Sequence, residues 1–362
     1  MKIGILTYYG VHNHGALLQA FALQNVLESF GNSVEFLTFR RNYDNIPSGN
    51  EKKYQIGISS IPFFIDYLNE NGIGTFKYNY MKRKKLNSFR NEKLKLGKRY
   101  SDCEVDSICI GSDEVFAIDV GINPFFYGHC LKNKNVFSYA GSFGQTTLKD
   151  IYNAGCDNLI SSGLNSMKSI GVRDINSYQI AEKLSGKKPE LLCDPVLLYG
   201  YKSEIENITH SNNSKPYILI YSYDKNMNKP NEISAIRSFA KNKGLKIYSV
   251  GYYHKWCDKN IAVSPIELLD WFKNAEFVIT DTFHGSVISI ITNSPFAAFV
   301  RNNANKLVFL LEQHGISDRI IKDFSELNEI YGKKIDYSAV NQKVEENREK
   351  ARNFLKKALA EK

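Results

Sequence analysis

One segment combines a histidine, an aspartate and small residues in a pattern suited to acid–base chemistry. Residues 277–286 read FVITDTFHGS, an apolar run followed by Thr-Asp-Thr and then by His-Gly before another apolar run. A helix N-terminus lowers the pKa of a histidine unless an anion is bound there. His284 would therefore suit proton transfer to an anionic substrate, although a lone histidine is more often structural.

Two further segments supply a guanidinium and a carboxylate. GVRD places Arg173 after an apolar run and just before a helix, where it could grip a carboxylate or phosphate through two parallel bonds. It could equally form a salt bridge with Asp174 or Asp194. IGSDEVF presents Ser112 and Asp113 after another apolar run, and Asp113 could accept a proton from a substrate hydroxyl or simply cap a turn.

Two glycine-containing loops could approach a ligand closely. Residues 10–19 read GVHNHGALLQ, so Asn13, His14 and Gly15 stand where a helix begins. The N–H groups at a helix N-terminus attract anions, but an ordinary capping turn would use the same residues. SYAGSFG, which contains Ser142, allows close approach of a ligand or ordinary packing.

These segments need a scaffold that brings them together. Short apolar runs alternate with longer amphipathic ones, which is typical of βαβ units and parallel sheets. We expect strands over 3–8, 34–39, 107–110, 136–140, 169–172, 191–193, 217–221, 246–250, 277–280 and 296–300. We expect helices over 16–30, 174–185, 231–242, 266–274, 284–292, 305–314 and 340–359, with a linker over 199–216.

The predicted fold class is α/β, with two Rossmann-like domains facing each other across a cleft. A chain of 362 residues commonly divides into two domains. We expect an N-terminal domain over 1–200 on the acceptor side, a C-terminal domain over 214–335 on the donor side, and a helix within 336–362 that packs back on the first domain. Ligands in such sheets bind beyond the carboxyl ends of the strands, where the segments above lie.

Net charge and its distribution indicate which classes of partner the chain could bind. The net charge is +9, and residues 81–100 alone carry nine Lys or Arg against one acid, Glu92. This run could be a solvated helix face, or a basic surface for an anionic, lipid-linked acceptor at a membrane. No helix-turn-helix or aromatic stacking pattern accompanies it, so we expect no nucleic acid partner.

The remaining composition favours a cytoplasmic protein without a metal. No apolar run reaches the ~18–20 residues of a membrane span, and the N-terminus resembles a buried strand more than a secretory signal. Six scattered cysteines without a C-x-x-C pair suggest buried free thiols in a reducing compartment. No His, Cys and Asp cluster has metal-ligand spacing, so we expect no metal and no resident cofactor.

Taken together and in order, the segments resemble the polysaccharide pyruvyl transferase family. The matching pieces are HNHGALLQAFALQ, IGSDEVF, SYAGSFG, GVRD, CDPVLL and VITDTFHGSVISI, with a looser match over 301–306 and 315–319. The resemblance implies a fold like the B-type glycosyltransferases. It also implies transfer of a pyruvyl group from phosphoenolpyruvate to two sugar hydroxyls as a ketal, during surface polysaccharide (exopolysaccharide or capsule) biosynthesis.

The resemblance also implies site roles. Arg173 and His284 match family residues that contact phosphoenolpyruvate, so we assign His284 as acid, Arg173 as carboxylate clamp and Asp113 as base. Some members carry arginine where this chain has Thr282, which leaves Lys306 or Arg301 to meet the donor's second anionic group. The expected substrate-binding residues are Asn13, His14, Gly15, Ser112, Ser142, Asp281, Thr282, Gly285, Arg301 and Lys306.

Two alternative functions stay open at this point. A glycosyltransferase that uses a nucleotide sugar could have the same two-domain fold, since fold does not fix function. A non-catalytic sugar- or anion-binding protein is the third reading. The sequence does not name the acceptor sugar, its linkage, its lipid attachment or the oligomeric state.

Overall fold

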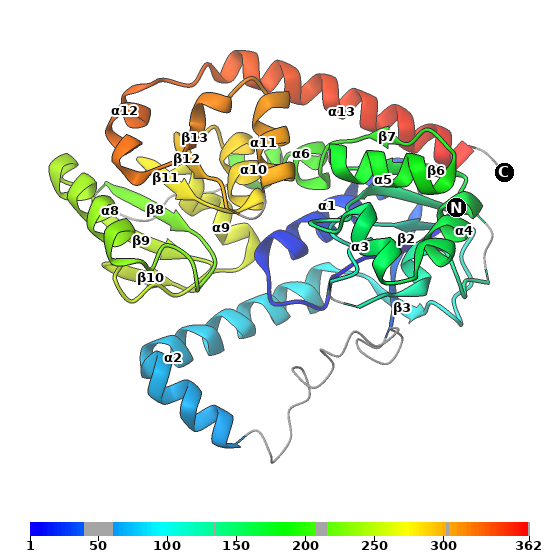
Figure 1. Cartoon of the computed structure of the whole chain (residues 1–362), viewed down its shortest axis with the longest axis horizontal. Coiled ribbons are helices and arrows are strands. Elements are labelled where there is room, and N and C mark those ends of the chain that lie inside the picture. The colour runs from blue at the N-terminus through cyan, green and yellow to red at the C-terminus, as the bar shows by residue number, and fades with distance from the viewer. Residues whose placement is uncertain (40–60, 120, 133–134, 208–215, 302–303, 361–362) are drawn as a thin grey trace.

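Two parallel β-sheets, each covered by helices on both faces, lie side by side (Figure 1). The structure is a computed structural model that describes residues 1–39, 61–119, 121–132, 135–207, 216–301 and 304–360. This architecture confirms the predicted α/β class with two Rossmann-like halves.

The first sheet has seven strands in the order β3-β2-β1-β4-β5-β6-β7, and every pair is parallel. The strands are β1 Lys2–Leu6, β2 Ser33–Thr38, β3 Leu96–Arg99, β4 Ser107–Ile110, β5 Val136–Gly141, β6 Ser169–Val172 and β7 Glu190–Leu191. Central strands such as β4 and β5 are buried along their whole length, as parallel strands covered on both faces must be.

The second sheet has six parallel strands in the order β10-β9-β8-β11-β12-β13. They are β8 Tyr217–Tyr221, β9 Lys246–Val250, β10 Lys259–Ile261, β11 Phe277–Thr280, β12 Phe296–Phe299 and β13 Ile320–Ile321. In each sheet the order reverses beside the first strand, and such switch points in open α/β sheets are where ligands bind.

Helices complete the layers. They are α1 His14–Ser29, α2 Ile61–Lys93, α3 Leu148–Asn153, α4 Asp157–Ser166, α5 Ile175–Ser185, α6 Pro195–Tyr199, α7 Lys202–Glu206, α8 Pro230–Lys243, α9 Pro265–Lys273, α10 Phe283–Ile291, α11 Ala304–Gln313, α12 Leu327–Gly332 and α13 Tyr337–Ala360. Short 3-10 helices occur at η3 Pro124–Tyr127, η4 Ser317–Arg319 and η5 Phe324–Glu326.

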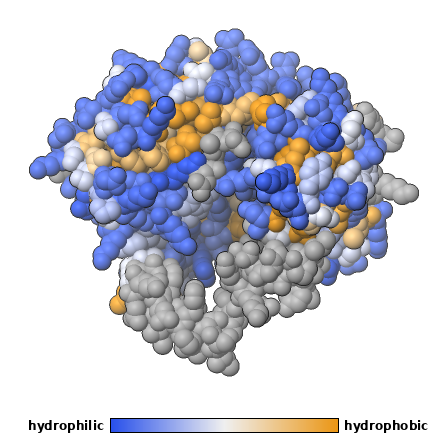
Figure 2. All heavy atoms as spheres, in the orientation of Figure 1, coloured by the Kyte–Doolittle hydropathy of each residue, from blue (hydrophilic) through white to orange (hydrophobic). Residues whose placement is uncertain are grey.

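One apolar cluster runs through both halves, built largely on α1, α6, α9, α10 and α13, and two further clusters cover the outer faces of the sheets. The face seen in Figure 2 is mostly hydrophilic, with its hydrophobic residues gathered in a band across the upper part of the view. Helix α13 spans both halves (Figure 1) and packs on the first one as predicted. Its Arg348 Nε donates to the Leu197 carbonyl at 2.6 Å, and Phe354 contacts Tyr139.

The structure corrects several predicted elements. Strand β1 ends at Leu6, short of residue 8, and the expected elements did not include β3, β10, β13 or the long helix α2. The predicted linker 199–216 contains α7, and its residues 208–215 lie outside the described ones. The segment connects β7 of the first sheet to β8 of the second, and its start is anchored in the core, because the buried Tyr201 hydroxyl donates to the Leu18 carbonyl at 2.6 Å.

The described residues also bear on the compositional predictions. The six cysteines are free; five are buried and Cys130 is exposed. Within the described chain, no helix is long and apolar enough to cross a membrane. The basic run 81–100 falls on the second part of α2 and on β3.

Candidate functional site

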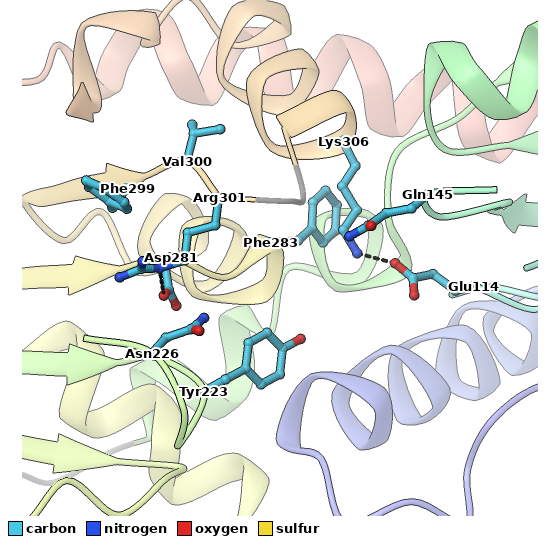
Figure 3. A pocket seen from close by; sticks show the side chains of 10 residues that line it. All are labelled: Glu114, Gln145, Tyr223, Asn226, Asp281, Phe283, Phe299, Val300, Arg301 and Lys306. Atoms are coloured by element: carbon cyan, nitrogen blue, oxygen red, sulfur yellow. Dashed lines mark hydrogen bonds and ion pairs between the residues drawn. The ribbon is translucent and has the colours of Figure 1, made fainter. Parts of the chain in front are cut away.

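A cavity of about 580 Å³ lies between the two halves, where strands of both sheets end (Figure 3). Its volume falls within the range of about 300–1,000 Å³ that is common for small-molecule sites. The lining residues are Glu114, Gln145, Tyr223, Asn226, Asp281, Phe283, Phe299, Val300, Arg301 and Lys306. Three predicted substrate-binding residues, Asp281, Arg301 and Lys306, are therefore among them.

The charges in the cavity are arranged as pairs. Arg301 Nε donates to Asp281 Oδ2 at 2.7 Å, and its Nη2 donates to Glu232 Oε1 at 3.0 Å. Burial raises the pKa of Asp281, although hydrogen bonds from Ser222 and Arg301 oppose this. Because two carboxylates of the second half bind it, the Arg301 guanidinium is held in one position in the cavity.

Lys306 forms an ion pair with Glu114 across the cleft, as the dashed line in Figure 3 shows. Glu114 follows β4 in the first sheet, and Lys306 lies in α11 of the second half. Both side chains are partly exposed. Glu114 thus occupies the place that an anionic ligand of Lys306 would take.

A second group of charges lies beside Phe283. Arg173 Nη1 donates to Asp194 Oδ2 at 2.8 Å, and Arg173 Nη2 lies 3.4 Å from Asp113 Oδ1. His284 Nε2 lies 3.7 Å from the same Asp194 oxygen. The Arg173 guanidinium stacks over the Phe283 ring at 4.4 Å. The structure therefore brings together His284, Arg173 and Asp113, the three residues predicted to be catalytic.

This charge group shifts the pKa values of its members. Burial raises the pKa of Asp113, but the charges of Arg173, His284 and Lys306 outweigh it and hold that pKa below its ordinary value. Burial lowers the pKa of His284, while the Asp194 and Asp113 carboxylates act in the opposite direction. At neutral pH these shifts favour an ionised Asp113 and a neutral His284.

Hydrogen bonds at the start of α10 place His284. Thr282 is the N-cap, and its hydroxyl accepts from the Gly285 amide at 2.9 Å. A Cβ at Gly285 would lie 2.0 Å from Thr280 Oγ1, so a glycine is needed for the helix to start this close to β11. Thr282 and Gly285 shape the backbone around His284 and are not part of the cavity lining.

The start of α1 contacts the second half. Asn13 Oδ1 accepts from the Gly15 and Ala16 amides, and Asn13 Nδ2 lies 3.4 Å from the Tyr252 hydroxyl. His14 is fully buried, and its Nε2 bonds to the Val263 carbonyl at 2.9 Å. Burial lowers the pKa of His14 to about 3. These contacts join the halves; ligand contact by Asn13, His14 or Gly15 stays a prediction.

The two predicted serines are buried in loop-stabilising bonds. Ser112 Oγ donates to Gln19 Oε1 at 2.6 Å, and Ser142 Oγ donates to Asp174 Oδ2 at 2.6 Å. Neither hydroxyl lines the cavity. Asp174 is in turn the N-cap of α5, so it holds the helix that follows Arg173 and does not pair with Arg173 itself.

Sequence reasoning missed several charged and aromatic residues of the site. Asp194 was considered only as a salt-bridge partner, although CDPVLL puts it between β7 and the start of α6, where site residues are expected. Glu114 stands next to Asp113 and was overlooked. Tyr223 follows β8 in the same way, and its position beyond a strand end was a usable signal. No group of three His, Cys, Asp or Glu side chains among the described residues is placed to hold a metal ion.

Comparison with known proteins gives a family match and a fold match. A family model described as polysaccharide pyruvyl transferase matches residues 13–303. No curated protein sequence matches the chain.

Solved structures of nucleotide-sugar enzymes have a similar fold. The UDP-N-acetylglucosamine 2-epimerase from Rickettsia bellii has a TM-score of 0.55 at 11% identity, covering 99% of this chain and 96% of that one. The UDP-GlcNAc 2-epimerase from Neisseria meningitidis, bound to UDP-GlcNAc, scores 0.51 at 8% identity and covers all of both chains. Arabidopsis thaliana UGT89C1, complexed with UDP-L-rhamnose, scores 0.50 at 9% identity, with 98% and 97% covered. At such identities the likeness shows only the fold, which is of the B-type glycosyltransferase kind.

Proposed function

Because this chain belongs to the polysaccharide pyruvyl transferase family, we propose that it transfers the pyruvyl group of phosphoenolpyruvate to two hydroxyls of a sugar, as a ketal. The main support for the proposal is that Arg173, Asp113 and His284 lie close together, beside a cavity that is lined by Arg301 and Lys306. In this set, Arg173 would bind the carboxylate of the donor, Asp113 would act as the base and His284 as the acid. Arg301 and Lys306 are the cations available to the donor phosphate.

Donor binding would exchange carboxylates within the site. The contact from Arg173 to Asp113, at 3.4 Å, is longer than the 2.8 Å contact to Asp194. The donor carboxylate would replace Asp113 on the Arg173 fork, which leaves Asp194 in place and frees Asp113 to act as a base. The donor phosphate would similarly replace Glu114 on Lys306, with Arg301 as the second candidate cation.

Donor charge would also prepare the acid. Burial lowers the pKa of His284. A bound trianion favours the charged imidazolium and so raises this pKa. Protonated His284 then delivers its proton to the methylene carbon of phosphoenolpyruvate.

The transfer follows as two additions at C2. Protonation of the methylene makes C2 an oxocarbenium-like electrophile, and a sugar hydroxyl adds to it while Asp113 takes the hydroxyl proton. The C2–O bond to phosphate then breaks, and a second hydroxyl adds to close the ketal. Two hydroxyl hydrogens leave the acceptor; one is balanced by the new methyl hydrogen and the other leaves with phosphate. Positioned acid–base groups typically contribute ~10²–10⁴-fold.

The acceptor side completes the proposal. We propose a lipid-linked oligosaccharide acceptor in the cytoplasm, at the inner face of the membrane, as a step in surface polysaccharide synthesis. The proposed chemistry needs no metal or resident cofactor, so turnover should persist in EDTA.

The test compares phosphoenolpyruvate with UDP-sugars. Phosphoenolpyruvate should raise the Tm of the protein, and phosphate should be released only when an acceptor glycan is present, with the acceptor gaining one pyruvate ketal by mass spectrometry. If UDP-sugars raise the Tm and are consumed while phosphoenolpyruvate is inert, the chain is instead a glycosyltransferase. If ligands bind without turnover, it is a binding protein.

A further inference from the structure

One side of helix α2 exposes large hydrophobic side chains. Ile73 is 79% exposed, Tyr80 62%, and Phe76 and Met81 are each 41% exposed. Spacings of three and four residues place Ile73, Phe76 and Tyr80 along one side of the helix, and Met81 flanks them. Among the described residues, the fold leaves these side chains largely exposed, and burying them against a partner would be favourable.

The opposite side of α2 is firmly packed. Tyr78, Leu86 and Phe89 are buried, and the buried Lys82 ammonium lies 3.9 Å from the centre of the Tyr252 ring. Tyr78 also contacts the Tyr253 ring at 5.7 Å between centroids. The helix is therefore held in one orientation, with its hydrophobic side directed outward.

The exposed side is also positively charged. Residues 71–91 contain six Lys or Arg and no Asp or Glu. Lys82 is buried and Lys85 pairs with Glu267, so these two serve the fold. Lys77, Arg83 and Lys84 are exposed beside the hydrophobic side chains.

The helix contacts both halves of the molecule. His12, in the loop before α1, is hydrogen-bonded to Asn87 of α2 at 3.1 Å. In Figure 1, α2 lies beneath the two halves, and its N-terminal part stands away from the body. A flat partner could therefore meet this side of α2.

We propose that the outward side of α2, formed by Ile73, Phe76, Tyr80, Met81, Lys77 and Lys84, binds the surface of an anionic lipid bilayer. Hydrophobic and aromatic side chains beside lysines, with no acid among them, are the composition of helices that lie in the membrane interface. Anionic lipid headgroups supply the complementary charge, and each basic residue near such a surface adds to the attraction.

The biological role of this membrane contact rests on the proposed function, because a lipid-linked acceptor would be presented at a membrane surface. Binding to vesicles needs neither donor nor acceptor. If the native chain binds vesicles but does not transfer a pyruvyl group, the proposed function alone is refuted. If it transfers a pyruvyl group but does not bind vesicles, this inference alone is refuted.

The experiment is sedimentation of the full-length chain with vesicles of phosphatidylcholine, with or without phosphatidylglycerol. The first variant combines Phe76→Ser with Tyr80→Ser, and the second combines Lys77→Glu with Lys84→Glu. Control variants with one change of each kind elsewhere on the surface are Tyr152→Ser on α3, where Tyr152 is 50% exposed, and Lys202→Glu on α7. All four sets change exposed side chains, so each should keep the native Tm.

We expect binding to phosphatidylglycerol vesicles to be at least tenfold stronger than to phosphatidylcholine alone. Both α2 variants should lose at least tenfold of this binding, and both controls should keep it. Equal binding by the α2 variants and the native chain would overturn the proposal. The proposal would also be overturned if the native chain bound neither kind of vesicle but formed dimers that the α2 variants cannot form. That result would assign the surface to a second copy of the chain.

Discussion

The backbone of Gly15, at the start of α1, lies directly against the imidazole ring of His284, at the start of α10. A Cβ built on Gly15 would stand 2.4 Å from both Cγ and Nδ1 of that ring, closer than any real contact. The two helices belong to different halves of the molecule. The absence of a side chain at Gly15 therefore lets the first half support the residue assigned as the acid.

Gly15→Ala should accordingly reduce turnover. The added methyl group must displace the His284 ring or separate the two helix ends, and a displacement of about 1 Å at a reacting group can cost around 10²-fold. Steady-state phosphate release at saturating phosphoenolpyruvate measures the effect. Gly10→Ala is the matched control, because Gly10 lies in the same loop and a Cβ there meets nothing within 4 Å. Equal losses in both variants would show that the loop, and not the ring contact, matters.

Glu114 and Lys306 should have opposite effects on donor affinity. Lys306→Met removes a cation from the cavity, and charge-assisted hydrogen bonds are worth ~1.5–3 kcal/mol, so donor Kd should rise about tenfold or more. Glu114→Gln removes the carboxylate that competes for Lys306, so donor Kd should fall. Titration calorimetry with phosphoenolpyruvate measures both. Weaker binding in both variants would mean that the ion pair mainly holds the two halves together.

The strands and the helices between them were largely readable, because buried parallel strands leave apolar runs such as YILIY at Tyr217–Tyr221. Helix α2 was not found. Its buried side carries Lys82, whose charge hides the helical repeat, and Gly72 has a φ of 76° that interrupts the helix. Strand β13 has only two residues and depends on pairing with β12, which no local pattern reveals.

The site was readable in its strand-end residues and less so in their partners. Arg173 and His284 follow strands and were found. Glu114 could be identified as a site residue only from its ion pair with Lys306, which lies 192 positions further along the chain. His14 illustrates the opposite limit. Its place at a helix start predicted a ligand contact, which stays a prediction, but the bond from its Nε2 to the Val263 carbonyl comes from the packing of the second half against α1, which no local pattern reveals.

His14 should make stability depend on acid pH. Burial lowers its pKa from 6.5 to about 3, so the unfolded chain binds more protons than the folded chain between these values. The stabilisation is present above pH 6.5 and is lost as the pH falls, by about 2 kcal/mol at pH 5. Urea unfolding at pH 7.5 and pH 5 measures it. His14→Gln, which can still donate to Val263, should lose less stability between the two pH values; an identical loss would contradict the assignment.

Asp194→Asn should shift the pH dependence of turnover. The Asp194 charge raises the pKa of His284, so its removal lowers that pKa. Because the reaction needs protonated His284, the decline in rate with rising pH should move to lower pH. Asparagine can still accept the Val196 amide at the start of α6, so the fold should persist. Single-turnover rates from pH 5 to 9 provide the profile, with Asp157→Asn on α4 as the control; an unshifted profile would show that Asp194 holds Arg173 without tuning His284.

His284→Asn is the decisive change for the proposed mechanism. Asparagine keeps some hydrogen-bonding capacity but cannot deliver a proton to carbon, so turnover should fall by about 10²–10⁴-fold while donor affinity changes much less. The native rate should decline as the pH rises through the pKa of His284 in the donor complex, and the asparagine variant should lack that decline. Burial lowers the pKa of His284, and the negative charge of the bound donor should raise it. Single-turnover phosphate release against pH, for both proteins, separates these effects from product release. A variant with near-native rate would make His284 a structural residue and would move the search for the acid to His12, which lies in the loop before α1 and is hydrogen-bonded to Asn87.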